Sequence, residues 1–396
     1  MVYLLDNPIR HYAWGSVSAI PELLGMPATG EPHAELWLGG YEGSASIART
    51  VTGRVPLDEL VRRDPVGALG VDVVDVLGSR LPYLMKVLAV ERPLSIQAHP
   101  TTEQAEAGYA AENDAGVPLD AFERSYRDPY HKPEFVVALS EFTALLGFRI
   151  PTEAEELMAD LRVPGLAEVV ELIRTPDGLA DTVQWMLTLP ADSATELAIS
   201  VAAACRDRSG IEPFTTLARI GDQFRDDRGV LLALLMQPVR LRAGEACAVP
   251  AGTPHCYLRG VVIEAQAASD NTLRAGLTPK YINVPELLSV LRYRPGVDLR
   301  LTPTPVDGTD VFELAGVLNV RLQRVRLEAD PVVVEGSLIV LVTDGRAELS
   351  VDGFTTAALE RGDSAFVPAD NGVFELIGAG TAFVVTPAVS ALGKAR

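Results

Sequence analysis

Two stretches of this sequence share one pattern and decide the predicted fold. The first is Leu241-Arg-Ala-Gly-Glu-Ala-Cys-Ala-Val-Pro-Ala251, and the second is Leu359-Glu-Arg-Gly-Asp-Ser-Ala-Phe-Val-Pro-Ala369. Both follow L-x-x-G-[ED]-x-x-x-V-P-A, a Gly-acid turn between short strands and then a corner that contains proline. This arrangement is typical of a double-sheet jelly roll. We therefore expect two related jelly-roll barrels.

The two copies diverge shortly after the shared pattern. The first copy continues to His255, whereas the position that aligns with it in the second copy is Val373. Histidine is a common metal ligand, and valine has no atom that can bind a metal. A metal site in the first barrel would therefore have no counterpart in the second.

The hydrophobic period changes along the chain and suggests three units. Short apolar runs bounded by Pro and Gly predict mainly strands and loops before Pro151. Thr152 and Glu155 then form a capping-box pattern, and helical spacing follows for about 90 residues. Alternating residues return near Leu241, with turns predicted at Asp344-Gly345 and Asp352-Gly353. We expect a mainly β fold with a catalytic jelly roll (residues 1–150 together with 240–300), a helical insertion (151–239) and a second, metal-free jelly roll (301–396).

Composition excludes several classes of protein. The chain has 396 residues, 48% of them hydrophobic, with 34 Lys+Arg against 53 Asp+Glu and hence a net charge of −19. This composition supports large packed cores, and the acidity disfavours nucleic acid or an anionic membrane as partner. No secretory signal and no run of about 20 apolar residues is present, so we expect a cytoplasmic protein. The three cysteines form no CxxC pair, which favours reduced, buried thiols.

Lysine is rare here. Of the 34 basic residues only four are Lys, namely Lys86, Lys132, Lys280 and Lys394, so ordinary basic positions are filled by Arg. Lysine is a compact cation whose pKa can be shifted by burial, and sites that need a point charge or a proton carrier favour it. All but Lys394 fall near the histidine and carboxylate clusters, which makes them candidates for a functional site.

Strand alternation places several polar side chains on common faces. It puts Ser95, Gln97 and His99 on one face of a strand, and it pairs Lys132 with Glu134 and His255 with Tyr257. If these faces point into one barrel, two imidazoles, one carboxylate and one amide oxygen can converge on a divalent ion. The ligands would be Gln97, His99, Glu134 and His255. Two histidines and a carboxylate suit Fe(II) as well as Zn²⁺, so the metal stays open at this point.

Longer strings carry a family resemblance. The strings are Tyr83-Leu-Met-Lys-Val-Leu, L-S-I-Q-A-H-P at residues 94–100, D-P-Y-H-K-P-E at 128–134, L-L-G-F-R at 145–149, V-P-A-G-T-P-H-C-Y-L at 249–258 and S-D-N-T-L-R-A-G-L-T-P-K at 269–280. Together with the early H-Y-A-W-G and A-E-L-W-L-G, they resemble type I mannose-6-phosphate isomerases, which belong to the cupin superfamily. The resemblance runs in order from about residue 3 to residue 285.

The resemblance implies a zinc-dependent aldose-ketose isomerase that interconverts mannose 6-phosphate and fructose 6-phosphate through an enediolate, with one Zn²⁺ per chain on a cupin scaffold. It places the zinc ligands on the four residues reached from the strand faces. It implies catalytic roles for Arg274, Lys132, Glu264, Asp270 and Tyr257. It implies substrate or phosphate binding by Ser95, Lys86 and Lys280. Glu264, Lys132, Asp270 and Lys86 all remain open as the catalytic base.

Two other functions fit the same residues. An iron cupin oxygenase would use the two histidines and the carboxylate, although Gln97 and the lysines argue against it. A non-catalytic sugar-binding protein would explain the metal-free second copy, but it would not need the retained cations. A phosphosugar is the expected partner, with no nucleic acid and no membrane, and the chain is expected to be a monomer.

Overall fold

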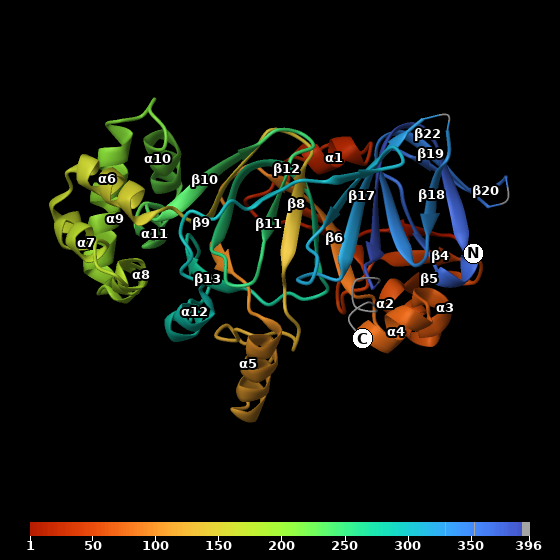
Figure 1. Ribbon diagram of the computed structural model, residues 1–396, viewed down its shortest axis with the longest axis horizontal. Helices are drawn as coiled ribbons and strands as arrows, with labels where there is room; N and C mark the ends of the chain where they lie inside the picture. Colours follow the sequence, from red (N-terminus) through yellow and green to blue (C-terminus); the bar gives the residue numbers. More distant parts are fainter. Residues whose placement is uncertain (329, 352, 390–396) are drawn as a thin grey trace.

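The computed structural model describes residues 1–328, 330–351 and 353–389. Figure 1 shows an elongated molecule, with a helical block at one end, a β-sheet region in the middle and a second β-sheet region at the other end. The prediction of a mainly β protein with a helical portion is therefore confirmed. No helix within these described ranges is both long enough and apolar enough to cross a membrane.

The middle region is built around one antiparallel sheet, which we call the central sheet. Strand β12 is its hub, because it pairs with β6 on one side, with β8 on the other, and with β7 and β9 at its start. The strands of this sheet are β2 (Ile9–Arg10), β3 (Glu35–Gly39), β6 (Tyr83–Val90), β7 (Ile96–Ala98), β8 (Glu134–Ala138), β9 (Phe142–Phe148), β10 (Met236–Leu241), β11 (Ala246–Val249), β12 (His255–Ala267), β13 (Leu273–Gly276) and β14 (Arg300–Leu301).

The second region, called the C-terminal sheet, combines both ends of the chain. Strand β1 pairs with β21, and β4 and β5 extend the sheet beyond β1. Strands β1, β4 and β5, all from the first 56 residues, therefore join a sheet made mostly from residues after 300. The strands are β1 (Tyr3–Asp6), β4 (Ile47–Thr50), β5 (Gly53–Pro56), β15 (Thr304–Val306), β16 (Thr309–Glu313), β17 (Val320–Leu327), β18 (Val332–Glu335), β19 (Leu338–Val351), β20 (Phe354–Glu360), β21 (Ser364–Val367) and β22 (Val373–Pro387).

The two copies of the repeat fold in the same way. In the first copy the Glu245 carboxylate accepts a hydrogen bond from the Arg242 amide at 2.8 Å. In the second copy the Asp363 carboxylate accepts from the Glu360 amide at 2.9 Å, at the equivalent position. The glycine before each acid has a positive φ, of 88° in the first copy and 93° in the second, which a glycine adopts without strain. The shared acid and glycine therefore specify one turn twice.

The faces of the central sheet have different environments. Met85, Val87 and Ile263 pack against the C-terminal sheet in a shared hydrophobic core. The intervening residues of β6 and β12, among them Lys86 and Glu264, point to the opposite face because successive strand side chains alternate. Lys86 and Glu264 are directly opposite each other in the β6–β12 register. Alternation thus separates an apolar packing face from a polar inner face.

The helical block covers the outer end of the central sheet (Figure 1). Its helices are α6 (Pro151–Leu161), α7 (Ala167–Leu172), α8 (Gly178–Thr188), α9 (Ala191–Arg206), α10 (Phe214–Gln223) and α11 (Gly229–Ala233). The predicted capping box at Thr152 is wrong: α6 begins at Pro151, and no side chain caps it. Proline is well suited to the first helical position because its φ is already helical and it has no amide hydrogen.

The expectation of mainly strands and loops before residue 150 missed several helices. These are α1 (Ala19–Leu23), α2 (Leu57–Arg63), α3 (Pro65–Leu69), α4 (Val71–Leu77) and α5 (Thr102–Asp114). Helix α5 buries only Ala105, so it has no apolar period to detect. Its signal is the capping box of Thr101 and Gln104, in which each side chain accepts a hydrogen bond from the backbone amide of the other residue. A short helix, α12 (Val284–Val290), lies between β13 and β14.

One predicted turn is also wrong. Asp344 and Gly345 lie inside β19, just after an irregularity in its pairing with β22 between Val342 and Asp344, and Gly345 has a φ of 71°. A glycine with a positive φ occurs in some irregular strands as well as in hairpin turns, so the dipeptide alone does not separate them. Gly353 has a φ of 77° between β19 and β20, but its partner Asp352 lies outside the described residues, as does Lys394.

Candidate active site

The proposed metal ligands meet at one end of the central sheet. One donor atom each from His99, Glu134 and His255 lies within 4.8 Å of the others, and all three residues are buried. The His99 Nε2 atom is 3.3 Å from Glu134 Oε2, and the His255 Nε2 atom is 3.4 Å from Glu134 Oε1. His99 follows β7, whereas Glu134 and His255 begin β8 and β12. Residues far apart in the chain therefore form one cluster.

Backbone carbonyls orient both imidazoles. The His99 Nδ1 atom is 2.8 Å from the Asn271 carbonyl oxygen, and the His255 Nδ1 atom is 3.1 Å from that of Thr253. With Nδ1–H donating to the carbonyl, each Nε2 keeps a lone pair on the side of the Glu134 carboxylate, which is the arrangement found around metal-binding histidines. The Lys132 ammonium also lies 3.2 Å from His99 Nε2. Burial lowers the pKa of His255 to about 3, so this ring is neutral. The donor set therefore fits a divalent ion such as zinc.

Gln97 lies beside this cluster. Strand β7 pairs with β12 on one side and with β13 on the other, so Gln97 is directly opposite His255 of β12 and Arg274 of β13. Its amide nitrogen donates to the Ser95 hydroxyl at 3.0 Å, so the two side chains share a face as the alternation predicts. The hydrogen bond to Ser95 uses the amide nitrogen and leaves the amide oxygen as a potential ligand.

Tyr257 and Lys132 both contact the central carboxylate. The Tyr257 hydroxyl donates to Glu134 Oε1 at 2.9 Å, and the Lys132 ammonium donates to Glu134 Oε2 at 2.5 Å. Burial opposes ionisation of Glu134, but Lys132 holds the pKa of this carboxyl well below its usual range. Burial and the carboxylate raise the pKa of Tyr257, which therefore stays protonated and donates. These contacts keep Glu134 ionised and fixed in place.

A second charged group lies on the same inner face. The Lys86 ammonium is 3.3 Å from the Glu264 carboxylate, 3.8 Å from Glu35, and 4.5 Å from the centre of the Trp37 ring. Burial disfavours the charge of Lys86, but the two carboxylates outweigh it and raise its pKa. Burial and the nearby Glu134 carboxylate raise the pKa of Glu264 to about 7. Lys86 is therefore a charged donor, and Glu264 can exchange a proton near neutral pH.

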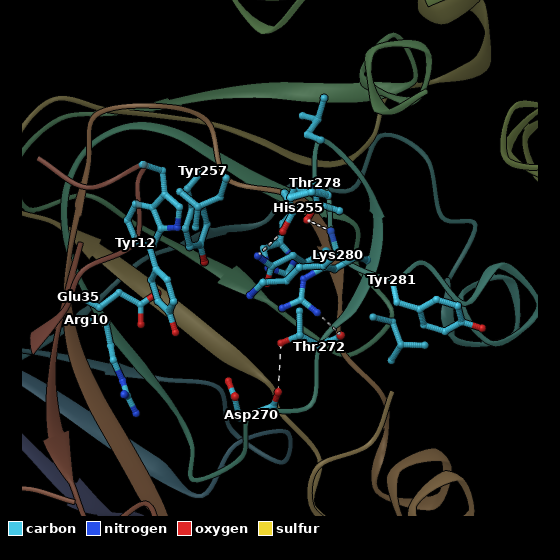
Figure 2. Close-up of a pocket in the computed structure, with 18 of the residues that line it drawn as sticks. Arg10, Tyr12, Glu35, His255, Tyr257, Asp270, Thr272, Thr278, Lys280 and Tyr281 are labelled. Carbon is cyan, nitrogen blue, oxygen red and sulfur yellow. Dashed lines mark hydrogen bonds between the residues drawn. The ribbon is translucent and has the colours of Figure 1, made fainter. Parts of the chain in front are cut away.

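All these groups except His99 line one cavity of about 870 Å³. His99 is fully buried beneath the surface of the cavity. Figure 2 shows Glu35, Tyr257, His255, Asp270 and Lys280 arranged around it. The cavity also brings together the remaining sequence-predicted residues, which are Lys86, Ser95, Gln97, Lys132, Glu134, Glu264 and Arg274.

The other histidines do not line the cavity, and the three cysteines are buried, as predicted for them. The His131 ring contacts the Thr102 hydroxyl at 2.9 Å and does not line the cavity. Cys205, Cys247 and Cys256 are all buried free thiols. Burial raises the pKa of Cys247 to about 12, so it is an unreactive thiol at neutral pH.

Several lining residues were not predicted. Glu35 and Trp37 hold Lys86, the Trp37 indole donates to Glu35 at 2.5 Å, and Tyr12 and Arg127 add to the wall. Tyr12, Glu35 and Trp37 lie within the H-Y-A-W-G and A-E-L-W-L-G strings, so the strings were the available signal. No spacing rule points to Arg127, because the cations that it lies near, Arg274 and Lys280, are far from it in the chain.

The fold and the site define a β-sheet protein with a buried His-Glu-His centre beside a cation-lined cavity. Residues 2–151 match the family model described as "Phosphomannose isomerase type I, catalytic domain". The chain is 35% identical over 383 residues to the mannose-6-phosphate isomerase of Salmonella typhimurium, covering 95% of this chain and 97% of that protein. It therefore belongs to the type I phosphomannose isomerase family.

Further relatives agree. The mannose-6-phosphate isomerase of Escherichia coli is 39% identical over 306 residues, which are 76% of this chain and 78% of that protein. A crystal structure of the Salmonella typhimurium enzyme, bound to its substrate and to zinc, has a TM-score of 0.90 and 34% identity. It covers 98% of this chain and 99% of the solved chain.

Proposed function

We propose that this protein is a zinc-dependent mannose-6-phosphate isomerase, which interconverts mannose 6-phosphate and fructose 6-phosphate. The observation that carries the proposal is the convergence of His99, Glu134 and His255 within 4.8 Å beside a cavity of about 870 Å³. A cavity of this size accommodates a sugar phosphate. The family assignment favours an isomerase over an iron oxygenase or a non-catalytic sugar-binding protein.

The metal would be held by His99, Glu134 and His255, with the Gln97 amide oxygen as a further ligand. One zinc ion bound there would supply a Lewis acid able to polarise a carbonyl or hydroxyl oxygen of the sugar, without redox chemistry of its own. Tyr257 and Lys132 support this centre by fixing Glu134. Their proposed role is to position the carboxylate rather than to exchange protons with the sugar.

We propose that the phosphate lies toward Lys280 and Arg274. Partial burial and the neighbouring Arg274 and Arg127 guanidinium groups lower the pKa of Lys280, so these three cations lie close enough to repel one another. A bound phosphate would relieve this repulsion. Lys86 is less suited to the phosphate than the sequence prediction held, because two carboxylates already neutralise it. Ser95 remains a candidate donor to the sugar.

Glu264 is the candidate base that the site supports best. The reaction takes the proton from C2 of the aldose and returns a proton to C1, through an enediolate. A base near neutral pH needs a pKa close to 7, which Glu264 has, while the Lys86 ammonium beside it is protonated and can donate to oxygen. Arg274 adds positive charge to the cavity. Asp270 remains the alternative, since it also lines the cavity.

We also propose that the two sheets are two cupin-type jelly rolls with the units given by the sequence. Equivalent turn hydrogen bonds in the two repeat copies support this. In this division, strands β1, β4 and β5 belong to the first unit by sequence but pair within the C-terminal sheet of the second unit. A monomer in the cytoplasm remains the expectation for assembly and location.

The direct experiment is turnover of mannose 6-phosphate by zinc-loaded protein, with fructose 6-phosphate measured as product. Chelation should abolish the activity, and zinc should restore it. Oxygen consumption by the iron-loaded protein would support the oxygenase alternative. Calorimetric binding of the sugar phosphate without conversion would support the binding protein.

A further inference from the structure

The wall of the cavity near Lys280 is anchored to the helical block by one side chain. Asp227 follows α10 and precedes α11. Its Oδ1 atom accepts from the Leu277 amide at 2.8 Å, and its Oδ2 atom accepts from the Thr278 amide at 2.9 Å. Oδ1 also accepts from the Gly229 amide at 2.6 Å, which fixes the carboxylate on its own side of the junction.

The backbone at this junction is held in a conformation that needs such support. Leu277 is 2% exposed and has a φ of 57°, in the left-handed region that is unfavourable for leucine. Beside it, a Cβ on Gly276 would lie 2.4 Å from the Gly229 Cα, so the two chain segments approach as closely as glycine permits. The Asp227 carboxylate therefore joins two backbones that meet without room for side chains.

The anchored segment leads directly to the cavity cations. The Thr278 hydroxyl accepts from the Lys280 amide at 3.1 Å, which continues the chain of contacts from Asp227 to the lysine. Thr278 and Lys280 both line the cavity, as Figure 2 shows. The Lys280 ammonium lies 5.6 Å from the centre of the Tyr12 ring, which belongs to the cavity wall. Phe224, at the end of α10, lines the same cavity.

We propose that Asp227 is a positioning residue for substrate binding, through which the helical block sets the place of Thr278 and Lys280 in the cavity wall. The inference rests on the proposed function, because it assigns the phosphate to this wall. It gives the helical block a role in affinity for the phosphorylated sugar. It gives the block no part in metal binding or proton transfer.

The test compares Asp227→Asn with Asp222→Asn. Asp222 lies on α10, but it pairs with Arg206 and does not line the cavity. Asparagine keeps one acceptor oxygen but turns an NH2 group toward a backbone amide. For Asp227→Asn we expect the KM for mannose 6-phosphate to rise about tenfold, with kcat within about twofold and zinc content unchanged. Asp222→Asn should change neither constant.

A double-mutant cycle with Lys280→Met shows whether Asp227 acts through the lysine. We expect Asp227→Asn to add little to the KM once Lys280 is replaced. If the two substitutions raise the KM independently, so that their effects multiply in the double variant, the proposal is overturned. A loss of both kcat and bound zinc in Asp227→Asn would also overturn it, because it would indicate a general structural defect. Should Asp227→Asn fail to fold, Thr278→Val serves instead, because it removes the hydroxyl that accepts from the Lys280 amide. This variant should raise the KM by about threefold. An unchanged KM would overturn the proposal.

Amide hydrogen exchange separates this inference from the proposed function. Asp227→Asn should speed exchange at Leu277 and Thr278, whether or not the wild-type protein turns over mannose 6-phosphate. An active wild type with unchanged exchange in the variant would refute the role of Asp227 alone. An inactive zinc-loaded wild type would refute the proposed function, and faster exchange in the variant would then still support the anchor.

Discussion

The two repeat copies share a turn but not a chemistry. After the common turn and corner, β12 begins at the buried His255 and β22 begins at Val373, which is 50% exposed. Further along, Glu264 of β12 lines the cavity, whereas Ala382, at the same offset in β22, is fully buried in an apolar core. The turn is therefore a structural device, and the chemistry depends on a few positions that follow it.

The difference also shows what each sheet contributes. The inner face of the central sheet carries charged residues that pair with each other, such as Lys86 with Glu264. The core of the C-terminal sheet is apolar around β19 and β22. Buried charges are costly unless they are paired or bind a ligand, so they remain in the sheet where a function uses them.

The largest expected effect comes from removing the histidine that distinguishes the copies. His255→Ala should lower kcat/KM at least about a thousandfold and abolish stoichiometric zinc, because an imidazole ligand is lost. The metal-free fold should persist, since the helical block and the C-terminal sheet have hydrophobic cores of their own. Metal analysis, a coupled assay and a circular-dichroism melt check this.

Val373→Ala is the matched control in the second copy, and its activity should stay within about twofold of the wild type. Stoichiometric zinc in His255→Ala, or activity loss in Val373→Ala, would break the comparison.

The next effect concerns Glu264. Glu264→Gln should lower kcat by about 100-fold or more while zinc stays bound, because the amide cannot accept the proton. In the wild type, kcat should fall as the pH falls through the pKa of Glu264, since protonation removes the base. Burial places this pKa at about 7, and a bound cation shifts it downward.

The pH profile of kcat is the measurement, and the acidic limb should disappear in Glu264→Gln. Glu245→Gln, in the repeat turn and outside the cavity, serves as control and should keep the limb. A Glu264→Gln enzyme with near-normal kcat would transfer the role to Asp270.

A smaller effect should appear on stability, in both copies. The turn glycines Gly244 and Gly362 both have a positive φ. An alanine at either position would have to adopt this unfavourable φ, which should lower the free energy of unfolding by about 1 kcal/mol. Gly362→Ala should cost more than Gly244→Ala. Its Cβ would lie 2.6 Å from the Leu23 carbonyl oxygen, a backbone atom, whereas that of Gly244 would meet the end of the Arg324 side chain, which can shift at the expense of its ion pair with Asp310. Urea unfolding of the metal-free variants measures both, and equal losses would contradict the packing argument.

The smallest effect tests the N-terminal strands within the C-terminal sheet. Asp6 of β1 pairs with Arg49 of β4 at 2.5 Å and with Arg54 of β5 at 2.6 Å, and the Arg49 hydrogen bond lowers the pKa of Asp6. Solvent screens this pair, so Asp6→Asn should cost less than about 1 kcal/mol. Because the folded pKa is depressed, the contribution is present at neutral pH and is lost as the pH falls below about 4.

Unfolding of Asp6→Asn and the wild type at pH 7 and pH 3 measures this difference. High salt should reduce it at pH 7. A loss that does not shrink between pH 7 and pH 3 would point to packing rather than charge.

Sequence reasoning succeeded where the signal was local. Strand alternation placed Ser95 with Gln97 and His255 with Tyr257, and the repeat identified both turns. It failed where two structures share one local signal, as at Gly345, where a glycine with a positive φ lies inside a strand and not in a hairpin turn. It also failed at α5, because a helix that packs little has no apolar period.

The sequence by itself determined the repeat, the family strings and the common faces of neighbouring residues, because each depends on residues close together in the chain. Only the tertiary structure decided that Lys86 is neutralised by Glu264 and Glu35, that Asp227 anchors the wall beside Lys280, and that β1 joins the C-terminal sheet. These contacts join residues far apart in the chain. Their free energy depends on burial and on the charges of all neighbours, which no local pattern specifies.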